Sequence, residues 1–340
     1  MSDRKRYLAD EGWLPAAIVA LRNAGLQVIA PVRDEKGAVN LAPVAEAGDV
    51  TTDYVNVQLP LKRVLFPATE SLLSYEKSEG GDVDMQPAPE PSGDEAAVIG
   101  CRPCDAAALE ILDAVFQWDY DDIPYRGRRD KLTVVSFACS SPDEHCFCTS
   151  VGGSPHGVRG SDVVVYECDG GSLLEPQTER GEQLIEKLAD GVRPAPDDAQ
   201  APSPPEVAPR FDTDKVKRWL DDHFESEFWV ETSLACLGCG ACSFLCPTCH
   251  CFDIVDEAAW NRGERRRNWD CCSFGQFTVH GSGHNPRPVQ SARCRQRVMH
   301  KFKYFPDRFE RIACVGCGRC IRACGVGRNL AHILAEIETK

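Results

Sequence analysis

Two short cysteine runs in the last third of the chain carry the clearest chemistry. The first reads CLGCGACSFLCP and contains Cys236, Cys239, Cys242 and Cys246 at C-x2-C-x2-C-x3-C spacing. The second reads CVGCGRCIRAC and repeats that spacing with Cys314, Cys317, Cys320 and Cys324. Two-residue spacers allow one loop to place three thiolates around the corners of a 4Fe-4S cluster, while a fourth thiolate comes from elsewhere. The spacing therefore predicts two 4Fe-4S clusters and a protein that carries electrons.

The ligands of the two clusters are expected to cross between the runs. In bacterial ferredoxins, the fourth cysteine of each run binds the cluster of the other run. One cluster is therefore predicted to bind Cys236, Cys239, Cys242 and Cys324, and the other Cys314, Cys317, Cys320 and Cys246. Structural zinc is the alternative, because C-x2-C pairs also bind that metal. Two quartets of one spacing, the first followed by Pro247, favour clusters over zinc.

Length and composition indicate a soluble globular protein of two domains. The chain has 340 residues, of which 26% are charged and 43% hydrophobic, and this length is enough for two separate cores. Its 19 cysteines do not indicate a secreted disulfide scaffold, because the chain is large and opens without an apolar signal segment. We expect a cytoplasmic protein with reduced or metal-bound cysteines, and no apolar run is long enough to span a bilayer.

The charge is distributed unevenly. Residues 211–340 hold 19 Lys and Arg against 16 Asp and Glu, whereas the whole chain has a formal charge of -14. The last part is thus basic by 3 and the part before it acidic by 17. Because cluster-bound thiolates carry negative charge, basic residues in the cluster-bearing segment would stabilise the clusters.

The fold class is predicted to be mixed α+β, with an N-terminal α/β domain followed by a mainly helical, ferredoxin-like dicluster domain. Helices are expected at 5–23, 106–116, 181–190 and 212–229, and strands at 26–32, 54–59, 96–100, 132–139 and 163–167. Asp105 is expected to cap the helix that follows it. Residues 77–95 are acidic and rich in Gly and Pro, so they are expected to form a mobile loop.

Four cysteines of the first domain follow or flank predicted strands. These are Cys104, Cys139, Cys146 and Cys148. Strand ends that collect thiolates at one edge of a sheet could hold a third cluster, and Cys104 at a helix start is a candidate ligand or reactive thiol. Buried free cysteines are also common, so the spacing alone leaves both interpretations open. Cys101 and Cys168 are expected to be packing or surface residues.

The domain boundary is expected in a proline-rich stretch. Residues 192–210 hold six prolines and no hydrophobic period, which is typical of a semi-extended linker. The predicted division is 1–191 for the α/β domain, 192–210 for the linker and 211–340 for the dicluster domain.

About sixty residues separate the two cysteine runs, more than a minimal ferredoxin has. This insert is basic and contains aromatic residues, which could bind nucleic acid. The acidic character of the whole chain and the lack of a helix-turn-helix or RNA-binding motif argue against that function. His223, in the helix before the first run, is expected to be a polar edge of that helix. Structural roles are also expected for the following histidines and cysteines: His250, His280, His284, His300, Cys271, Cys272 and Cys294.

A combination of motifs resembles a known family over most of the chain, from about Leu65 to Cys324. The motifs are RPCD, CFCTSVGG, CPTCHCFDI, NWDCC, GHNPRP, the R-x-R-x-x-HKF run from Arg295, and CVGCGRC. Together they resemble the beta (iron-sulfur) subunit of soluble NAD(P)-linked nickel-iron hydrogenases, or sulfhydrogenases. They resemble less closely the iron-sulfur subunit of anaerobic sulfite reductase. The resemblance implies two ferredoxin-like 4Fe-4S clusters, and it favours the third, because the family has cysteines matching Cys104, Cys139, Cys146 and Cys148.

The implied function is an electron relay without a catalytic site of its own. The implied partners are the small and large subunits of a nickel-iron hydrogenase and a flavin subunit that binds NAD(P)H. Two alternatives remain: the electron-transfer subunit of an anaerobic sulfite reductase complex, and a free ferredoxin-type carrier. The sequence contains no dinucleotide-binding glycine motif after a strand, no P-loop and no nucleophile-base pair.

Two features depart from the family pattern. Gly325 stands where the family usually has a proline after the last cysteine of the second run, which puts the local backbone in doubt but not the ligand. Cys101 is an additional cysteine, so either it or Cys104 is the iron ligand. Asp105 is a candidate oxygen ligand or hydrogen-bonding neighbour of the cluster. The roles of Cys249, Cys251 and Cys272 are not assigned by the spacing.

Overall fold

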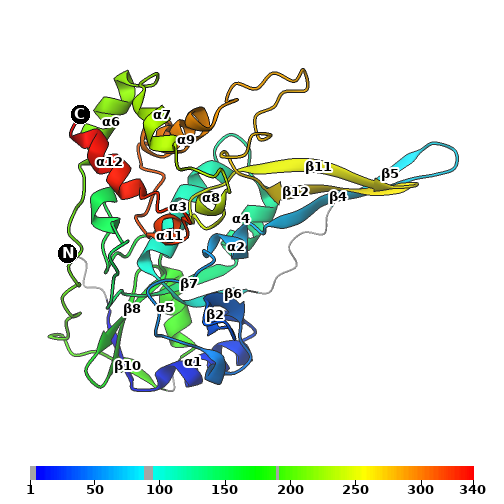
Figure 1. Ribbon diagram of the computed structural model, residues 1–340. Helices are drawn as coiled ribbons and strands as arrows, with labels where there is room; N and C mark the ends of the chain where they lie inside the picture. The colour runs from blue at the N-terminus through cyan, green and yellow to red at the C-terminus, as the bar shows by residue number, and fades with distance from the viewer. Residues whose placement is uncertain (1–4, 88–94, 189–190) are drawn as a thin grey trace. The chain divides into compact units, whose positions relative to one another are not determined.

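The structure is a computed structural model that describes residues 5–87, 95–188 and 191–340 (Figure 1). Its chain forms two units by spatial clustering. The first contains residues 1–61, 93–210 and 314–318, and the second contains residues 62–92, 211–313 and 319–340. The predicted division assigns residues 62–92 to the first domain and residues 314–318 to the second. In the structure, 62–92 belong to the second unit and 314–318 to the first. Strand pairing explains the first case, because part of 62–92 pairs with strands from the insert.

The first unit is built on an eight-stranded sheet with the order β10-β1-β9-β8-β7-β6-β2-β3. Its strands are β1 (Tyr7–Asp10), β2 (Gln27–Arg33), β3 (Val39–Pro43), β6 (Ala96–Cys101), β7 (Leu132–Phe137), β8 (Val163–Cys168), β9 (Gly171–Pro176) and β10 (Val192–Pro194). The central strands β2, β6, β7 and β8 are parallel. The sequences of these strands are largely apolar because helices cover both faces of a parallel sheet.

Four α-helices accompany this sheet in the described residues of the first unit. They are α1 (Trp13–Asn23), α3 (Pro103–Phe116), α4 (Ile123–Asp130) and α5 (Glu179–Glu186). Short 3-10 turns lie at η1 (Ala47–Asp49) and η2 (Cys148–Val151). The main core packs α1 and α5 against β2, β6, β7 and β8, with Ile18, Ile99 and Leu184 among its buried members. This core fixes the ends of the central strands, where the cysteines of this unit lie.

The second unit combines short helices with a four-stranded antiparallel sheet. The sheet has the order β11-β12-β4-β5, and its strands are β4 (Thr69–Lys77), β5 (Val83–Pro87), β11 (Phe252–Ala259) and β12 (Arg262–Trp269). Figure 1 shows these strands side by side as an extended ribbon. The helices are α2 (Lys62–Leu65), α6 (Thr213–Asp222), α7 (Phe228–Ser233), α8 (Ala241–Phe244), α9 (Gln290–Met299), α10 (Phe305–Phe309), α11 (Arg319–Arg322) and α12 (Leu330–Glu338). A π-helical turn, η3 (His300–Tyr304), joins α9 to α10.

Several local predictions are wrong in the described residues. The segment 54–59 is not a strand; its alternating apolar residues reflect side-chain burial, as at Val57. The helix expected from residue 5 begins at Trp13, because β1 occupies Tyr7–Asp10 in the sheet. The expected loop at 77–95 contains β5, which gains backbone hydrogen bonds from β4 despite its polar sequence. The rest of that loop, residues 88–94, lies outside the described residues.

Other differences concern element ends. The helix expected from residue 106 begins at Pro103, since proline is well suited to a first helical position. Arg102 is its N-cap and Asp105 lies inside the first turn, so Asp105 is not the cap. The helix expected at 212–229 is two helices, α6 and α7. Among the described residues, no helix has the length and apolar character required to cross a bilayer.

Candidate metal centres

The first cysteine run forms a curled loop ahead of α8. Gly238 and Gly240 adopt the left-handed backbone region, with φ of 66° and 77°. At Gly240 a Cβ atom would lie 2.8 Å from the Phe274 ring, so a side chain there would meet both strain and a clash. These two glycines allow the loop to turn between its cysteines, as the two-residue spacing predicts.

The thiols of this loop line a cavity together with cysteines from the second run. The cavity is partly open to solvent, and its lining includes Cys236, Cys239, Cys242, Cys320 and Cys324. Apolar side chains complete it, among them Val298, Leu330 and Ile333. Among the described residues, no three side chains of His, Cys, Asp or Glu converge closely enough for a single metal ion. Thiols spread around one cavity fit the larger 4Fe-4S cluster, whose ligands are cysteine thiolates.

Hydrogen-bond donors point at the sulfur atoms of this cavity. The backbone N–H of Arg328 donates to Cys324 Sγ over 3.2 Å, and Gln290 Nε2 donates to Cys236 Sγ over 3.3 Å. The pKa of Cys236 is lowered to about 5, chiefly by a hydrogen bond from the Cys294 thiol. Such donors favour a thiolate, the form that binds iron. Cys294, expected to have only a structural role, also lines this cavity.

Cys246, the last cysteine of the first run, is buried beside a lysine. Lys301 Nζ lies 3.3 Å from Cys246 Sγ and donates to Thr248 Oγ1 and to the Ala313 carbonyl, each at 2.8 Å. The Thr248 hydroxyl lies 3.2 Å from the same sulfur. The pKa of Cys246 is lowered, first by a hydrogen bond from the Cys249 thiol and further by the charges of Lys301 and Arg297. This sulfur therefore lies in a cationic, water-poor environment.

Two further buried cations lie beside the same segment. Arg297 donates to the Cys242 carbonyl over 2.7 Å and to Cys249 Sγ over 3.3 Å. Lys62 donates to the Cys249 carbonyl over 2.9 Å and lies 4.1 Å from the centre of the Trp269 ring. These contacts of Arg297 and Lys62, all within the described part of the chain, are with carbonyls, sulfur and an aromatic ring. Burying a cation without an anion costs several kcal/mol, so nearby thiolates are the physically appropriate counter-charge.

In the first unit, strand ends bring cysteines to one edge of the sheet. The parallel neighbours β6 and β7 end next to each other, and Cys104 and Cys139 follow these two ends. Cys148 begins the 3-10 turn that follows. Parallel strands place their carboxyl ends at one edge of the sheet, so Cys104 and Cys139 follow strand ends that lie at the same edge.

Burial dominates the electrostatics of these thiols. It raises the pKa of Cys139 to about 11, against the opposing charge of Arg102, and Cys148 is one of its charged neighbours. Arg102 donates to the carbonyls of Val55 and Ala138, at 3.1 and 3.2 Å. Cys146 Sγ lies 3.3 Å from Asp143 Oδ1. The structure thus makes Cys139 and Cys148 electrostatic neighbours, while Cys104 is placed at the same edge by topology.

The start of the second cysteine run packs against Cys148 within this unit. Phe147 N–H donates to the Gly316 carbonyl over 2.9 Å, and Gly316 has a φ of 63°. A Cβ atom on Gly316 would lie 2.5 Å from the backbone nitrogen of Cys148. Asn56 Nδ2 donates to the Cys317 carbonyl over 2.8 Å. Only glycine permits this approach, which brings Cys148 into the electrostatic neighbourhood of Cys317.

The remaining cysteines lie outside these sets. Cys101 is buried with its sulfur 3.9 Å from the Val135 carbonyl, and Cys168 ends β8. The Cys272 thiol is in hydrogen-bond contact with those of Cys251 and Cys271. Asp105 is fully buried. Cys101 is thus a buried residue of the packed interior. Cys251, Cys271 and Cys272 form a separate thiol group in the second unit.

None of the described histidines lines the cavity of the second unit. The rings of His250 and His300 lie 5.3 Å apart, and burial lowers their pKa values to about 3 and about 4. The His223 ring stacks on Trp219 at 4.4 Å, and the rings of His280 and His284 lie 5.3 Å apart. Sequence reasoning missed Gln290, Arg297, Lys301 and Arg328 as site residues. The basic R-x-R-x-x-HKF run was the available signal for two of them, Arg297 and Lys301.

Comparisons with known proteins agree with the cysteine pattern. Residues 235–328 match the 4Fe-4S dicluster domain family. Over 336 residues, which cover 96% of this chain and 96% of the relative, the sequence is 28% identical to sulfhydrogenase 2 subunit beta of Pyrococcus furiosus. No solved structure matches the chain. The resemblance read from the motifs is thereby confirmed, and the chain carries a 4Fe-4S dicluster domain after a mixed helix and strand region.

Proposed function

We propose that this protein is the non-catalytic iron-sulfur subunit of a soluble hydrogenase complex, through which electrons pass between a nickel-iron catalytic module and a flavin subunit that binds NAD(P)H. The observation that carries the proposal is the cavity of the second unit, whose lining joins three thiols of the first run to Cys324 of the second. The similarity over 96% of both chains to a sulfhydrogenase beta subunit supports the choice of complex. When bound, each 4Fe-4S cluster supplies a site that accepts and releases one electron.

The proposed ligand sets follow the crossed arrangement. The first cluster is held by Cys236, Cys239, Cys242 and Cys324, and the second by Cys314, Cys317, Cys320 and Cys246. The cavity lining supports the first set. The second set rests on the spacing and on the cationic surroundings of Cys246. A third cluster at Cys104, Cys139, Cys146 and Cys148 rests on the shared sheet edge and on the electrostatic proximity of Cys139 and Cys148.

Within each unit, cysteines assigned to different ligand sets are neighbours. In the first unit, Cys148 of the third set is an electrostatic neighbour of Cys317 of the second set. In the second unit, Cys320 of the second set lines the same cavity as the first set. The residues around the sulfur atoms exclude water and donate hydrogen bonds, which set the reduction potentials.

The cellular setting follows from the cysteine chemistry. Thiols that bind iron are kept reduced in a cytoplasm. We therefore propose a cytoplasmic complex. The proposed functional organisation is an α/β domain (1–191), a linker (192–210) and a dicluster domain (211–340). Residues 62–92 belong to the second unit and residues 314–318 to the first.

Anaerobic purification of the native complex tests the function. We expect co-purifying nickel and flavin, and about twelve irons per copy of this chain if all three clusters are present. Siroheme in place of nickel would instead identify a sulfite reductase complex. Elution of the chain alone at 37.4 kDa with its clusters intact would identify a free carrier. Zinc without absorption from iron-sulfur charge transfer would overturn all three interpretations.

A further inference from the structure

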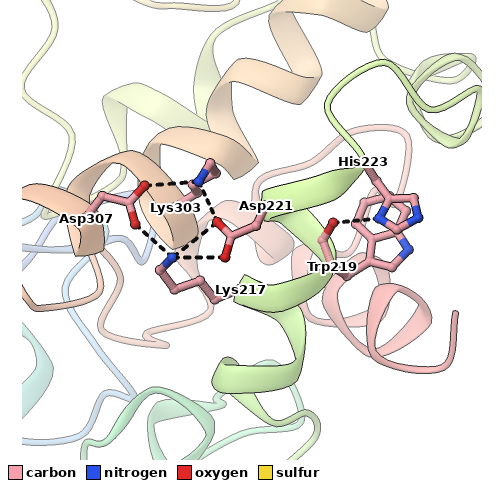
Figure 2. Close-up of polar contacts among 6 residues, drawn as sticks. All are labelled: Lys217, Trp219, Asp221, His223, Lys303 and Asp307. Atoms are coloured by element: carbon pink, nitrogen blue, oxygen red, sulfur yellow. Dashed lines mark hydrogen bonds and ion pairs between the residues drawn. The ribbon is translucent and has the colours of Figure 1, made fainter.

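The π-helical turn η3 presents two lysines to different environments. Lys301 is buried at 3% exposure and contacts Cys246 Sγ. Lys303, two residues later, contacts two carboxylates, Asp221 of α6 and Asp307 of α10 (Figure 2). π-helical turns are rare and are frequently found at functional sites. This turn therefore has an inner lysine at a candidate cluster ligand and an outer lysine in an ion-pair network.

The inner lysine is held by a closed set of polar contacts. Thr248 Oγ1 accepts from Lys301 Nζ, lies near Cys246 Sγ and donates to the Ala313 carbonyl over 2.8 Å. Lys301 Nζ donates to the same carbonyl. Because ammonium, hydroxyl and sulfur contact one another, the position of the charge relative to the sulfur is fixed by more than one bond.

The outer lysine fixes the turn from the opposite side. Lys217 Nζ lies 2.8 Å from a carboxylate oxygen of Asp307 and 3.2 Å from one of Asp221, and Lys303 Nζ lies 3.1 Å from Asp307 (Figure 2). These pairs connect α6 to the turn and to α10. They provide a matched position for comparison, since Lys303 carries the same charge on the same turn and is paired with carboxylates.

A buried positive charge next to a cluster ligand has a predictable electrostatic effect. Adding an electron makes an iron-sulfur cluster and its thiolates more negative, so a nearby cation stabilises the reduced form more than the oxidised form. The effect is large where the dielectric constant is low, and hydrogen bonds and charge around the sulfur atoms set cluster potentials. Loss of such a cation must therefore make reduction harder.

We propose that Lys301, held by Thr248, is a positioning residue that raises the reduction potential of the cluster bound through Cys246. The inference rests on the proposed function, because it requires a cluster at that sulfur. Its geometric basis is the 3.3 Å contact between Lys301 Nζ and Cys246 Sγ inside a buried polar set. The residue thereby makes that cluster easier to reduce.

An EPR-monitored reductive titration of the whole complex with dithionite tests the proposal. In Lys301→Met, one cluster signal should shift to a more negative midpoint while the iron content per chain stays unchanged. Lys301→Arg should keep the midpoint close to that of the unaltered protein, because it retains the charge. Lys303→Met is the control and should leave every midpoint in place. Unchanged midpoints in an iron-replete Lys301→Met protein would overturn the proposal.

A second variant decides the matter if Lys301→Met loses its iron. Lys301→Gln removes the charge and keeps a polar side chain that can donate to Thr248 Oγ1 or to the Ala313 carbonyl. A more negative midpoint of the same cluster signal in Lys301→Gln supports the proposal, and an unchanged midpoint overturns it. Failure of the proposed function has a different signature, since the unaltered protein would then purify without nickel and flavin, whatever the midpoints of its clusters.

Discussion

The cysteines of the two units reach their candidate sites by different routes. In the second unit, three thiols come from one glycine-containing loop, and Cys324 joins them from the second run. In the first unit, Cys104 and Cys139 follow two parallel strands, β6 and β7, that lie side by side. Local spacing determines the first arrangement, whereas sheet topology determines the second. Strand ends that are held by a core can therefore bring cysteine-bearing loops to one edge of a sheet without a regular motif.

The electrostatic surroundings differ in the same way. In the second unit, Lys301 and Arg297 contact sulfur directly, at 3.3 Å from Cys246 and Cys249. In the first unit, the hydrogen bonds of Arg102 go to backbone carbonyls. Correspondingly, a hydrogen bond from the Cys249 thiol, aided by the charges of Lys301 and Arg297, lowers the pKa of Cys246, while burial raises that of Cys139 to about 11. The surroundings of Cys246 thus favour a thiolate, and those of Cys139 favour a neutral thiol.

Removing the ligand that joins the two runs tests the loop-based site most strongly. Cys324→Ser should cost about four irons per chain, because a serine hydroxyl does not replace a thiolate in a cubane cluster. Iron and sulfide analysis with EPR measures the loss. Cys168→Ser is the control, since Cys168 ends β8 and belongs to none of the proposed ligand sets. Full iron content in Cys324→Ser would contradict crossed ligation.

The strand-edge site is tested by the corresponding change in the first unit. Cys148→Ser should also remove about four irons per chain and one EPR signal, while the signals of the first and second clusters remain. The Cys324→Ser protein is the comparison, since each variant should lose a different signal. If Cys148→Ser keeps all its iron, the cysteines of the first unit are packing residues and the two regions differ in kind.

Sequence reasoning predicted the second region better than the first because its information is local. The spacing from Cys236 to Cys246 and the glycines between them indicate a cluster loop without any knowledge of the fold. The buried strands β6, β7 and β8 and the helices α3 and α5 were also recognisable, from apolar runs and helical periodicity. What these patterns do not contain is strand pairing between distant segments.

The missed features all depend on such pairing or on burial. The strand β5 is polar and exposed, and it forms because β4 pairs with it. The segment around Val57 alternates like a strand yet has no ladder partner in the described residues. In the sequence, Arg297 and Lys301 belong to a basic segment. They are buried because of the way α9 and η3 pack in the structure. Charge in a sequence does not reveal which side of a helix is covered.

The close approach of Gly316 to Cys148 within the first unit is tested by adding a side chain at the glycine. In Gly316→Ala, the positive φ should cost about 1–2 kcal/mol, and the added Cβ would also clash with the backbone at Cys148. We expect a lower apparent unfolding midpoint in a thermal scan and a perturbed EPR signal from the third cluster. The signal should change because the Phe147–Gly316 hydrogen bond positions Cys148.

A second glycine separates these two costs. Gly327 has a φ of 67° and no atom within 4 Å of a Cβ placed on it, so Gly327→Ala should show the backbone cost alone. Gly316→Ala should therefore be the less stable of the two variants. Equal unfolding midpoints and an unchanged third signal would mean that the close approach at Cys148 is relaxed in solution.

The smallest expected effect concerns the ion-pair network that holds η3 from outside (Figure 2). The hydrogen bond from Lys303 holds the pKa of Asp221 below its ordinary value, and Lys217 adds to this effect. A carboxyl group with a lowered pKa in the folded state stabilises the protein above its unfolded pKa of about 3.9, and this contribution disappears as the pH falls through the folded pKa. Because these side chains are partly exposed, Asp221→Asn should lower the free energy of unfolding by less than about 1 kcal/mol at pH 7.

That small difference has a signature that distinguishes it from a packing effect. It should shrink as the pH falls below about 4 and as salt screens the charges, measured by chemical denaturation of the variant beside the unaltered protein. Asp222→Asn, one residue along the same helix and outside the network of Figure 2, is the control. A pH-independent loss in Asp221→Asn would show that Asp221 acts through its shape rather than its charge. The cluster potentials should stay unchanged in both variants, because the charge at Lys301 is held by Thr248 and Ala313 and not by this network.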